Sequence, residues 1–140
     1  MAEASTKITG HCLCGAVTVT ATANAVPRLR ACHCDMCRRH TSGAFFSIEA
    51  DVVQIDGPAR SFRSSDWAER GFCGTCGSTL WYGTVADGVR NLSAGLFDNA
   101  GGGEMKIEFF ADRCPHGYAL AGDHRRLSSA ETEALFGGGA

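Results

Sequence analysis

Short stretches in which apolar and polar residues alternate run along most of the chain. The segment AVTVTA at residues 16–21 alternates cleanly, and most such stretches are separated by Gly, Asn, Asp or Pro. Alternation with a period of two places every second side chain on one face of a β-strand. The pattern predicts strands at residues 16–21, 29–34, 44–49, 52–56, 60–63, 69–73, 79–82, 89–96 and 106–110. The sequence therefore predicts a mainly β fold.

Only two places favour a helix. Residues 35–40 (DMCRRH) lack strand alternation, and Gly43 is expected to stop the turn that they form. Ser128 is followed three residues later by Glu131, which is the spacing of a capping box. The short C-terminal helix that this box opens is expected to end before the glycines at residues 137–139.

The glycine-rich stretches between the strands are expected to be turns. The three glycines at residues 101–103 are expected to form a hairpin tip between two strands. The pattern shows no internal repeat and no linker, so the sequence predicts a single domain over residues 1–140.

Composition and charge narrow the function classes. The chain has 140 residues, eight cysteines and a formal net charge of −2. Its basic clusters, at residues 38–40 and 124–126, are too short for a nucleic-acid surface, so no nucleic-acid partner is expected. The polar N-terminus and the lack of a long apolar run predict a cytoplasmic protein with no membrane partner. In a reducing cytoplasm, eight cysteines favour metal ligands or catalytic thiols over disulfides.

Four of the cysteines form two pairs with the spacing of metal ligands. Cys12 and Cys14 stand two residues apart where a strand begins, so both sulfurs can face one ion. Cys73 and Cys76 are separated by two residues, and a tight turn brings such a pair onto the same ion. Four thiolates without a histidine are typical of a closed, tetrahedral structural zinc site. The sequence predicts this site, against a disulfide or free thiols as the alternative.

Three further cysteines, Cys32, Cys34 and Cys37, crowd into six residues. A catalytic zinc keeps one coordination position open, whereas a structural zinc is closed by four protein ligands. The triad therefore predicts an open zinc site. Two alternatives remain: His40 or Asp35 supplies a fourth ligand, or the triad is a metal-free redox centre. His33 is a poor ligand because its side chain should leave the strand on the opposite face.

These cysteine blocks resemble the signature of the glutathione-dependent formaldehyde-activating enzyme (GFA) family. The matching blocks are GHCLCGAV at residues 10–17, CHCDMCRR at 32–39 with SG at 42–43, and RGFCGTCGS at 70–78. The resemblance covers roughly residues 8–122. It implies a β-tent, that is, antiparallel sheets pinned by zinc. It also implies a structural ion on Cys12, Cys14, Cys73 and Cys76 and a catalytic ion on Cys32, Cys34 and Cys37.

The resemblance also implies an activity and a substrate. Members of the family add glutathione to formaldehyde to give S-hydroxymethylglutathione, and the reverse reaction is that of a carbon–sulfur lyase. Glutathione carries two carboxylates, which Arg38 and Arg39 are positioned to bind directly after the triad. The expected partner is thus a small thiol or aldehyde adduct, with His40 as a candidate for proton transfer.

Two other functions fit the same cysteines. The chain is alternatively a non-catalytic, zinc-stabilised β-tent binding module, or a thiol and zinc redox sensor. An open coordination position at the triad favours the enzyme, because a binding module has no need of one. Cys114 stands alone and is expected to be a small buried hydrophobic residue.

Overall fold

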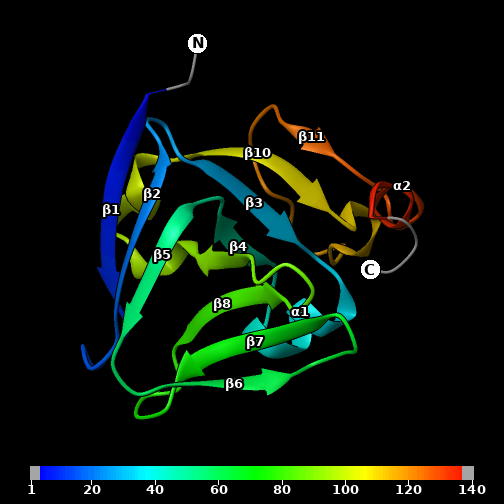
Figure 1. Cartoon of the computed structure of the whole chain (residues 1–140). Coiled ribbons are helices and arrows are strands. Elements are labelled where there is room, and N and C mark those ends of the chain that lie inside the picture. Colours follow the sequence, from blue (N-terminus) through cyan, green and yellow to red (C-terminus); the bar gives the residue numbers. More distant parts are fainter. Residues whose placement is uncertain (1–3, 137–140) are drawn as a thin grey trace.

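The computed structural model describes residues 4–136 and is mainly β, as the sequence predicts (Figure 1). Its strands are β1 (Ser5–His11), β2 (Thr18–Asn24), β3 (Arg28–Cys32), β4 (Phe45–Ile48), β5 (Asp51–Asp56), β6 (Ala59–Arg63), β7 (Ala68–Cys73), β8 (Thr79–Thr84), β9 (Arg90–Ser93), β10 (Glu104–Phe109) and β11 (Arg125–Arg126). Its helices are α1 (Asp35–Thr41) and α2 (Ser129–Leu135), with 3₁₀ turns η1 (Ala94–Leu96), η2 (Asp98–Gly102) and η3 (Ala111–Arg113).

The strands form two sheets with the core between them. The smaller sheet has the order β1-β2-β5, and the larger has the order β11-β10-β3-β4-β9-β8-β7-β6. Alternate residues of β2, including Val19 and Ala21, are buried in one cluster with Ile48, Leu80 and Leu92 of the larger sheet. In Figure 1 the smaller sheet stands at one side of the larger one. Burial of this apolar surface between the sheets stabilises the fold.

Strand β10 departs from the predicted antiparallel arrangement. It runs parallel to both β3 and β11, whereas the other paired strands are antiparallel. The prediction of a hairpin tip at residues 101–103 is therefore wrong, because β9 and β10 are not neighbours. Backbone of positive φ from Asn99 to Gly102 instead turns the chain so that it crosses to the far side of β3.

Strand β1 was not predicted, because residues 5–11 are mostly polar and only Ile8 and Gly10 face inward. Cys12 therefore does not open the first strand. It lies in the turn between β1 and β2, where its N–H donates to the Val17 carbonyl at 3.0 Å and its carbonyl accepts from Gly15 N–H at 3.1 Å. The strand argument for Cys12 and Cys14 is corrected to a turn.

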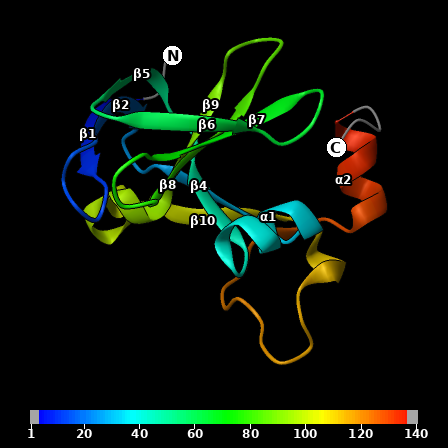
Figure 2. The ribbon, with the colours of Figure 1, turned by 90° about the horizontal axis from the view of Figure 1, so that it is seen from below.

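The helices lie near both predicted places. Cys34 caps α1, and its sulfur accepts a hydrogen bond from the Cys37 N–H at 3.4 Å. The helix ends at Ser42, which adopts the left-handed conformation (φ 68°), one residue before the expected stop. The capping box of Ser128 and Glu131 opens α2 as predicted. The glycines at residues 137–139 lie outside the described residues. Figure 2 shows α1 and α2 apart from each other.

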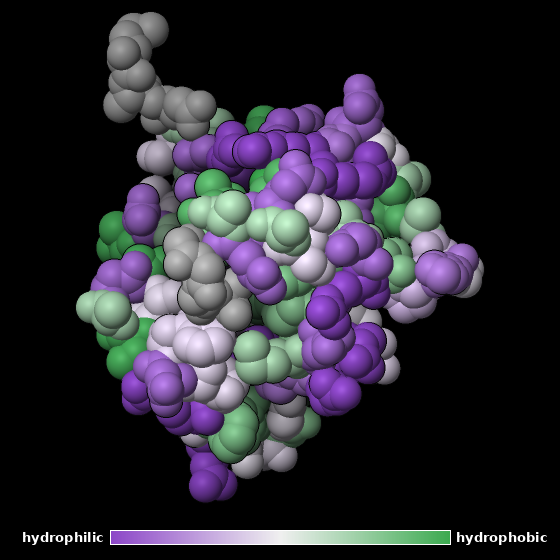
Figure 3. Space-filling model, turned by 90° about the vertical axis from the view of Figure 1, so that its right-hand side faces the viewer, coloured by the Kyte–Doolittle hydropathy of each residue, from purple (hydrophilic) through white to green (hydrophobic). Residues whose placement is uncertain are grey.

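The helices and one face of the surface were compared for apolar character. Within residues 4–136, no helix combines the length and the apolar character needed to cross a membrane. Figure 3 shows the right-hand side of the molecule in Figure 1, where hydrophobic residues lie in small groups between hydrophilic ones. Small scattered apolar groups of this kind are normal on a protein surface.

Candidate metal centres

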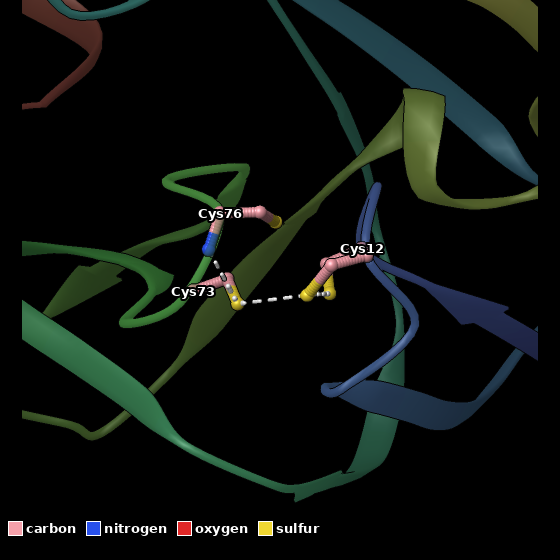
Figure 4. A group of neighbouring side chains, drawn as sticks. Cys12, Cys73 and Cys76 are labelled. Carbon is pink, nitrogen blue, oxygen red and sulfur yellow. Dashed lines mark hydrogen bonds between the residues drawn. The ribbon is translucent and has the colours of Figure 1, made fainter.

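The first cluster joins two turns that are far apart in the sequence. The sulfurs of Cys12 and Cys14, from the β1–β2 turn, and of Cys73 and Cys76, from the β7–β8 turn, all lie within 4.8 Å of one another. Cys12 Sγ is 3.6 Å from Cys14 Sγ, which is 3.9 Å from Cys73 Sγ. Figure 4 shows Cys12, Cys73 and Cys76 directed toward a common point. We call these four cysteines the tetrad. Its all-sulfur donor set fits a tetrahedral divalent ion.

Backbone N–H groups and a serine surround the tetrad sulfurs. Val17 N–H donates to Cys12 Sγ at 3.3 Å, and Cys76 N–H donates to Cys73 Sγ at 3.4 Å. Ser78 Oγ lies 3.1 Å from Cys76 Sγ, and this contact and the backbone at Ser78 lower the pKa of Cys76 to about 5. Gly77 permits the turn, because its φ of +78° is costly for other residues. These donors stabilise thiolates, the form that binds metal.

The second cluster contains the three cysteines predicted to form the open site, which we call the triad. Cys32 ends β3, Cys34 caps α1 and Cys37 lies in the first turn of α1, and their sulfurs lie within 4.8 Å of one another. In residues 4–136 no ligand atom of a His, Asp or Glu joins this group. The structure therefore does not bring His40 or Asp35 in as a fourth ligand.

The triad sulfurs lie close enough together to shift one another's pKa. The pKa of Cys34 is held well below its usual value despite its burial. The causes, largest first, are hydrogen bonds with the side chains of Cys32 and Cys37, the Cys37 N–H and the charge of Arg70. Contacts with the side chains of Cys34 and Cys37, and then burial, raise the pKa of Cys32. The surroundings of Cys34 thus favour its thiolate, the form that binds metal.

Arg70 is a functional candidate that the sequence reasoning missed. It lies on β7, is only 3% exposed, and its Nη1 donates to Cys37 Sγ at 3.5 Å. Its guanidinium carbon lies 5.0 Å from the centre of the Tyr82 ring on β8. A signal was present in the sequence, because Arg70 lies in the strand predicted at residues 69–73, two residues after the apolar Ala68. In the observed strand β7 both side chains are buried on the same face.

His33 lies just beyond β3, which ends at Cys32, and its ring nitrogens do not join the triad. Its Nε2 lies 2.7 Å from Glu108 Oε1 on β10, and both side chains are buried. The other oxygen of Glu108 contacts His124 Nε2 and lies 2.9 Å from Arg126 Nε. Burial raises the pKa of Glu108, but the hydrogen bonds from His124 and His33 outweigh it and give a net lowering. This network fixes the backbone between Cys32 and Cys34.

A cleft of about 1040 Å³ lies beside the C-terminal end of α1. It is lined by Arg39 and His40, by Phe45 and Ser93, and by Cys12 and Tyr118 across from them. The triad cysteines do not line it. Arg38 does not line it and instead pairs with Asp35, at 3.4 Å.

His40 is one of two histidines, with His11, whose side chains line this cleft. Burial, and then the positive charge of Arg70, lower its pKa, which favours the neutral ring. Its Nδ1 is buried and has no hydrogen-bond partner among the described residues. A neutral imidazole with an unpartnered nitrogen is able to take up a proton from a bound molecule. Cys114, half-buried, contacts the Tyr118 carbonyl at 3.5 Å and is remote from both clusters.

Comparison with known proteins agrees with the cysteine geometry. Residues 7–113 match the family model described as glutathione-dependent formaldehyde-activating enzyme. The chain belongs to this family. A relative named as an uncharacterized lyase, from Schizosaccharomyces pombe, is 36% identical to this GFA-family chain over 76 residues, which is 52% of this chain. The match spans 55% of the length of that relative, about half of it.

A solved structure is similar in fold. The crystal structure of a Rhodobacter sphaeroides protein superposes with a TM-score of 0.55, covers 86% of this GFA-family chain and 100% of the other, and is 17% identical. At this identity the likeness shows the fold alone. The family assignment agrees with the two cysteine clusters, each of which could hold a metal ion.

Proposed function

We propose that this chain is a zinc-dependent carbon–sulfur lyase-type enzyme that forms and breaks thiol–aldehyde adducts at the triad. Glutathione and formaldehyde, with S-hydroxymethylglutathione as the adduct, are the substrates that the family suggests. In the forward direction the thiol sulfur bonds to the aldehyde carbon, and the thiol proton ends on the aldehyde oxygen. A cytoplasmic location remains a prediction from the sequence.

One observation carries the proposal, namely the contrast between the two clusters. The tetrad offers four sulfurs and the triad three, with no fourth His, Asp or Glu ligand in residues 4–136. Both all-sulfur sets fit zinc, which is four-coordinate in closed sites and keeps a free position in catalytic ones. We therefore assign structural zinc to Cys12, Cys14, Cys73 and Cys76, and catalytic zinc to Cys32, Cys34 and Cys37.

The residues around the triad support thiol chemistry. When bound, zinc offers a position at which a substrate thiol loses its proton and is held as a thiolate. Cys32, Cys34 and Cys37 would hold that ion. His40, three residues after Cys37 on α1, is suited to receive the proton. Of the two arginines predicted to bind carboxylates, Arg39 lines the cleft, whereas the charge of Arg38 is already paired with Asp35. We therefore favour Arg39 as the anchor for a glutathione carboxylate.

The test is the rate at which glutathione and ¹³C-formaldehyde equilibrate with their adduct, followed by NMR with the zinc-loaded protein. We expect the wild type to speed this exchange above the buffer rate. Cys37→Ser should abolish the acceleration and lower the zinc content from two ions to one per chain, with the tetrad zinc and the fold intact. Ser, which replaces a small thiol by a hydroxyl, preserves the volume.

Two results contradict the proposal. One is a zinc-loaded wild type, with two ions, that gives no acceleration with glutathione or with other small thiols. The other is a Cys37→Ser variant that keeps full acceleration. A redox sensor would give the first of these results. It would also release the triad zinc before the tetrad zinc under mild peroxide.

A further inference from the structure

Arg70 is a buried cation beside the triad that no carboxylate neutralises. The ion pairs within residues 4–136 do not include it. Its Nη1 donates to Cys37 Sγ at 3.5 Å, its guanidinium stacks over Tyr82, and its Nε has no partner among the described residues. A buried, uncompensated charge is costly, so Arg70 needs a negative group nearby. The sulfurs of the triad are the group that it contacts.

The charge of a loaded triad matches that of Arg70. Three thiolates around a divalent ion carry one net negative charge, and one guanidinium brings the total to zero. The sulfurs of the tetrad have other surroundings. Cys14 is exposed to solvent. Cys12 and Cys73 accept hydrogen bonds from the N–H groups of Val17 and Cys76, and Cys76 Sγ lies beside Ser78 Oγ. Within residues 4–136, an arginine donates a hydrogen bond to a cysteine sulfur at the triad, from Arg70 to Cys37, and at no tetrad sulfur. The guanidinium thus distinguishes the triad from the tetrad.

We infer that Arg70 is the positioning residue of the triad, holding Cys37 Sγ toward the other two sulfurs and balancing the charge of a bound divalent ion. This inference rests on the proposed metal at the triad. The Tyr82 ring on β8, 5.0 Å from the guanidinium carbon, adds a cation–π contact that helps to hold the guanidinium in place. Cys37 itself is 4% exposed, so water does not replace this hydrogen bond.

The experiment measures metal binding, not turnover. Metal-free protein is titrated with Zn²⁺ in competition with a chromophoric chelator, for the wild type, Arg70→Gln and Arg70→Lys. Loss of a group that orients a ligand typically weakens metal affinity roughly 10–100-fold, which is the loss expected at the triad of Arg70→Gln. Arg70→Lys keeps the positive charge but not the planar guanidinium, so its zinc affinity at the triad should fall less than that of Arg70→Gln. In both Arg70 variants the zinc affinity of the tetrad should not change. Arg125→Gln, which alters an exposed arginine on β11, is the control, and the zinc affinity of both clusters should stay at the wild-type value.

A spectroscopic readout separates this role from simple packing. With Co²⁺ in place of Zn²⁺, the thiolate-to-cobalt absorption of the triad is the difference between the wild type and Cys37→Ser. Loss of a hydrogen bond to a thiolate raises the energy of the sulfur electrons, so in Arg70→Gln this band should move to longer wavelength. If Arg70→Gln fails to fold, Tyr82→Leu removes the ring that orients Arg70, and Tyr82→Phe is its matched control. A shift in Tyr82→Leu and a smaller one in Tyr82→Phe support the inference.

The outcomes distinguish this inference from the proposed function. The role of Arg70 is overturned if Arg70→Gln binds metal at the triad as tightly as the wild type and shows the same cobalt band. If Arg70→Gln does not fold, the same result in Tyr82→Leu overturns it. This holds even if the zinc-loaded wild type catalyses adduct exchange. Weaker binding and a moved band with an inactive wild type uphold Arg70 and contradict the proposed reaction. A wild-type triad that binds neither Zn²⁺ nor Co²⁺ overturns both.

Discussion

Glu108 on β10 holds His33, the residue between Cys32 and Cys34, in place. Its carboxylate is 3% exposed, and it receives hydrogen bonds from His33, which lies between two triad ligands, and contacts His124 and Arg126. Glu108→Gln removes the charge that these groups share. Breaking a buried pair in this way costs about 3–5 kcal/mol. We expect a loss of that size in the free energy of unfolding of the metal-loaded protein, measured with urea near neutral pH.

The pH dependence of this loss gives a second check. The pKa of Glu108 is lowered from 4.5 in the folded protein. A lowered pKa means that the carboxylate stabilises the fold fully above the unfolded value, and that this stabilisation is lost as the pH falls through the folded pKa. The difference between wild type and Glu108→Gln should therefore shrink below pH 4.5. A difference that stays constant into acid contradicts the prediction. The control is Glu104→Gln, an exposed residue of the same strand, with a change within about 0.5 kcal/mol.

At the scale of elements, α2 depends on its first turn. Ser128 Oγ accepts from Glu131 N–H at 3.1 Å, and Glu131 Oε1 accepts from Ser128 N–H at 3.0 Å. Thr132, fully buried, joins the helix to the end of β10 because its Oγ1 accepts from Phe110 N–H at 3.1 Å. Ser128→Ala should destabilise α2 by about 1 kcal/mol. Amide hydrogen exchange in residues 129–135 should speed up accordingly, while Ser128→Thr keeps the slow exchange.

The sequence predicts the elements whose contacts are local. The capping box, the triad and each cysteine pair of the tetrad were predictable because each depends on residues a few positions apart. The contacts of Arg70 and Glu108 were not, because their partners lie 33 and 75 residues away and meet them only in the folded chain. The parallel pairing of β10 with β3 was also missed, since the alternation of a strand does not reveal its neighbour. Strand β1 shows the same limit, because its few inward residues are small or isolated.

At the scale of the whole molecule, the two clusters differ in what they connect. The triad lies within one short segment, residues 32–37, so its metal closes no long loop. The tetrad joins turns whose sulfurs are 59 residues apart in sequence, and it links the smaller sheet to β7 and β8. Structural zinc contributes on the order of 10 kcal/mol in small peptides, so loss of the tetrad ion should unfold much of the domain.

These differences predict that a strong chelator removes the two ions in separate steps. The triad ion should leave first, because a site with an open position is attacked more readily than one closed by four thiolates. This step should end adduct exchange without changing the fluorescence of Trp81, which is buried in the core. The second ion should leave together with a change in that fluorescence and a loss of β signal in circular dichroism. Cys37→Ser should show the second step alone. Loss of both ions in one step, together with unfolding, contradicts separate roles for the two clusters.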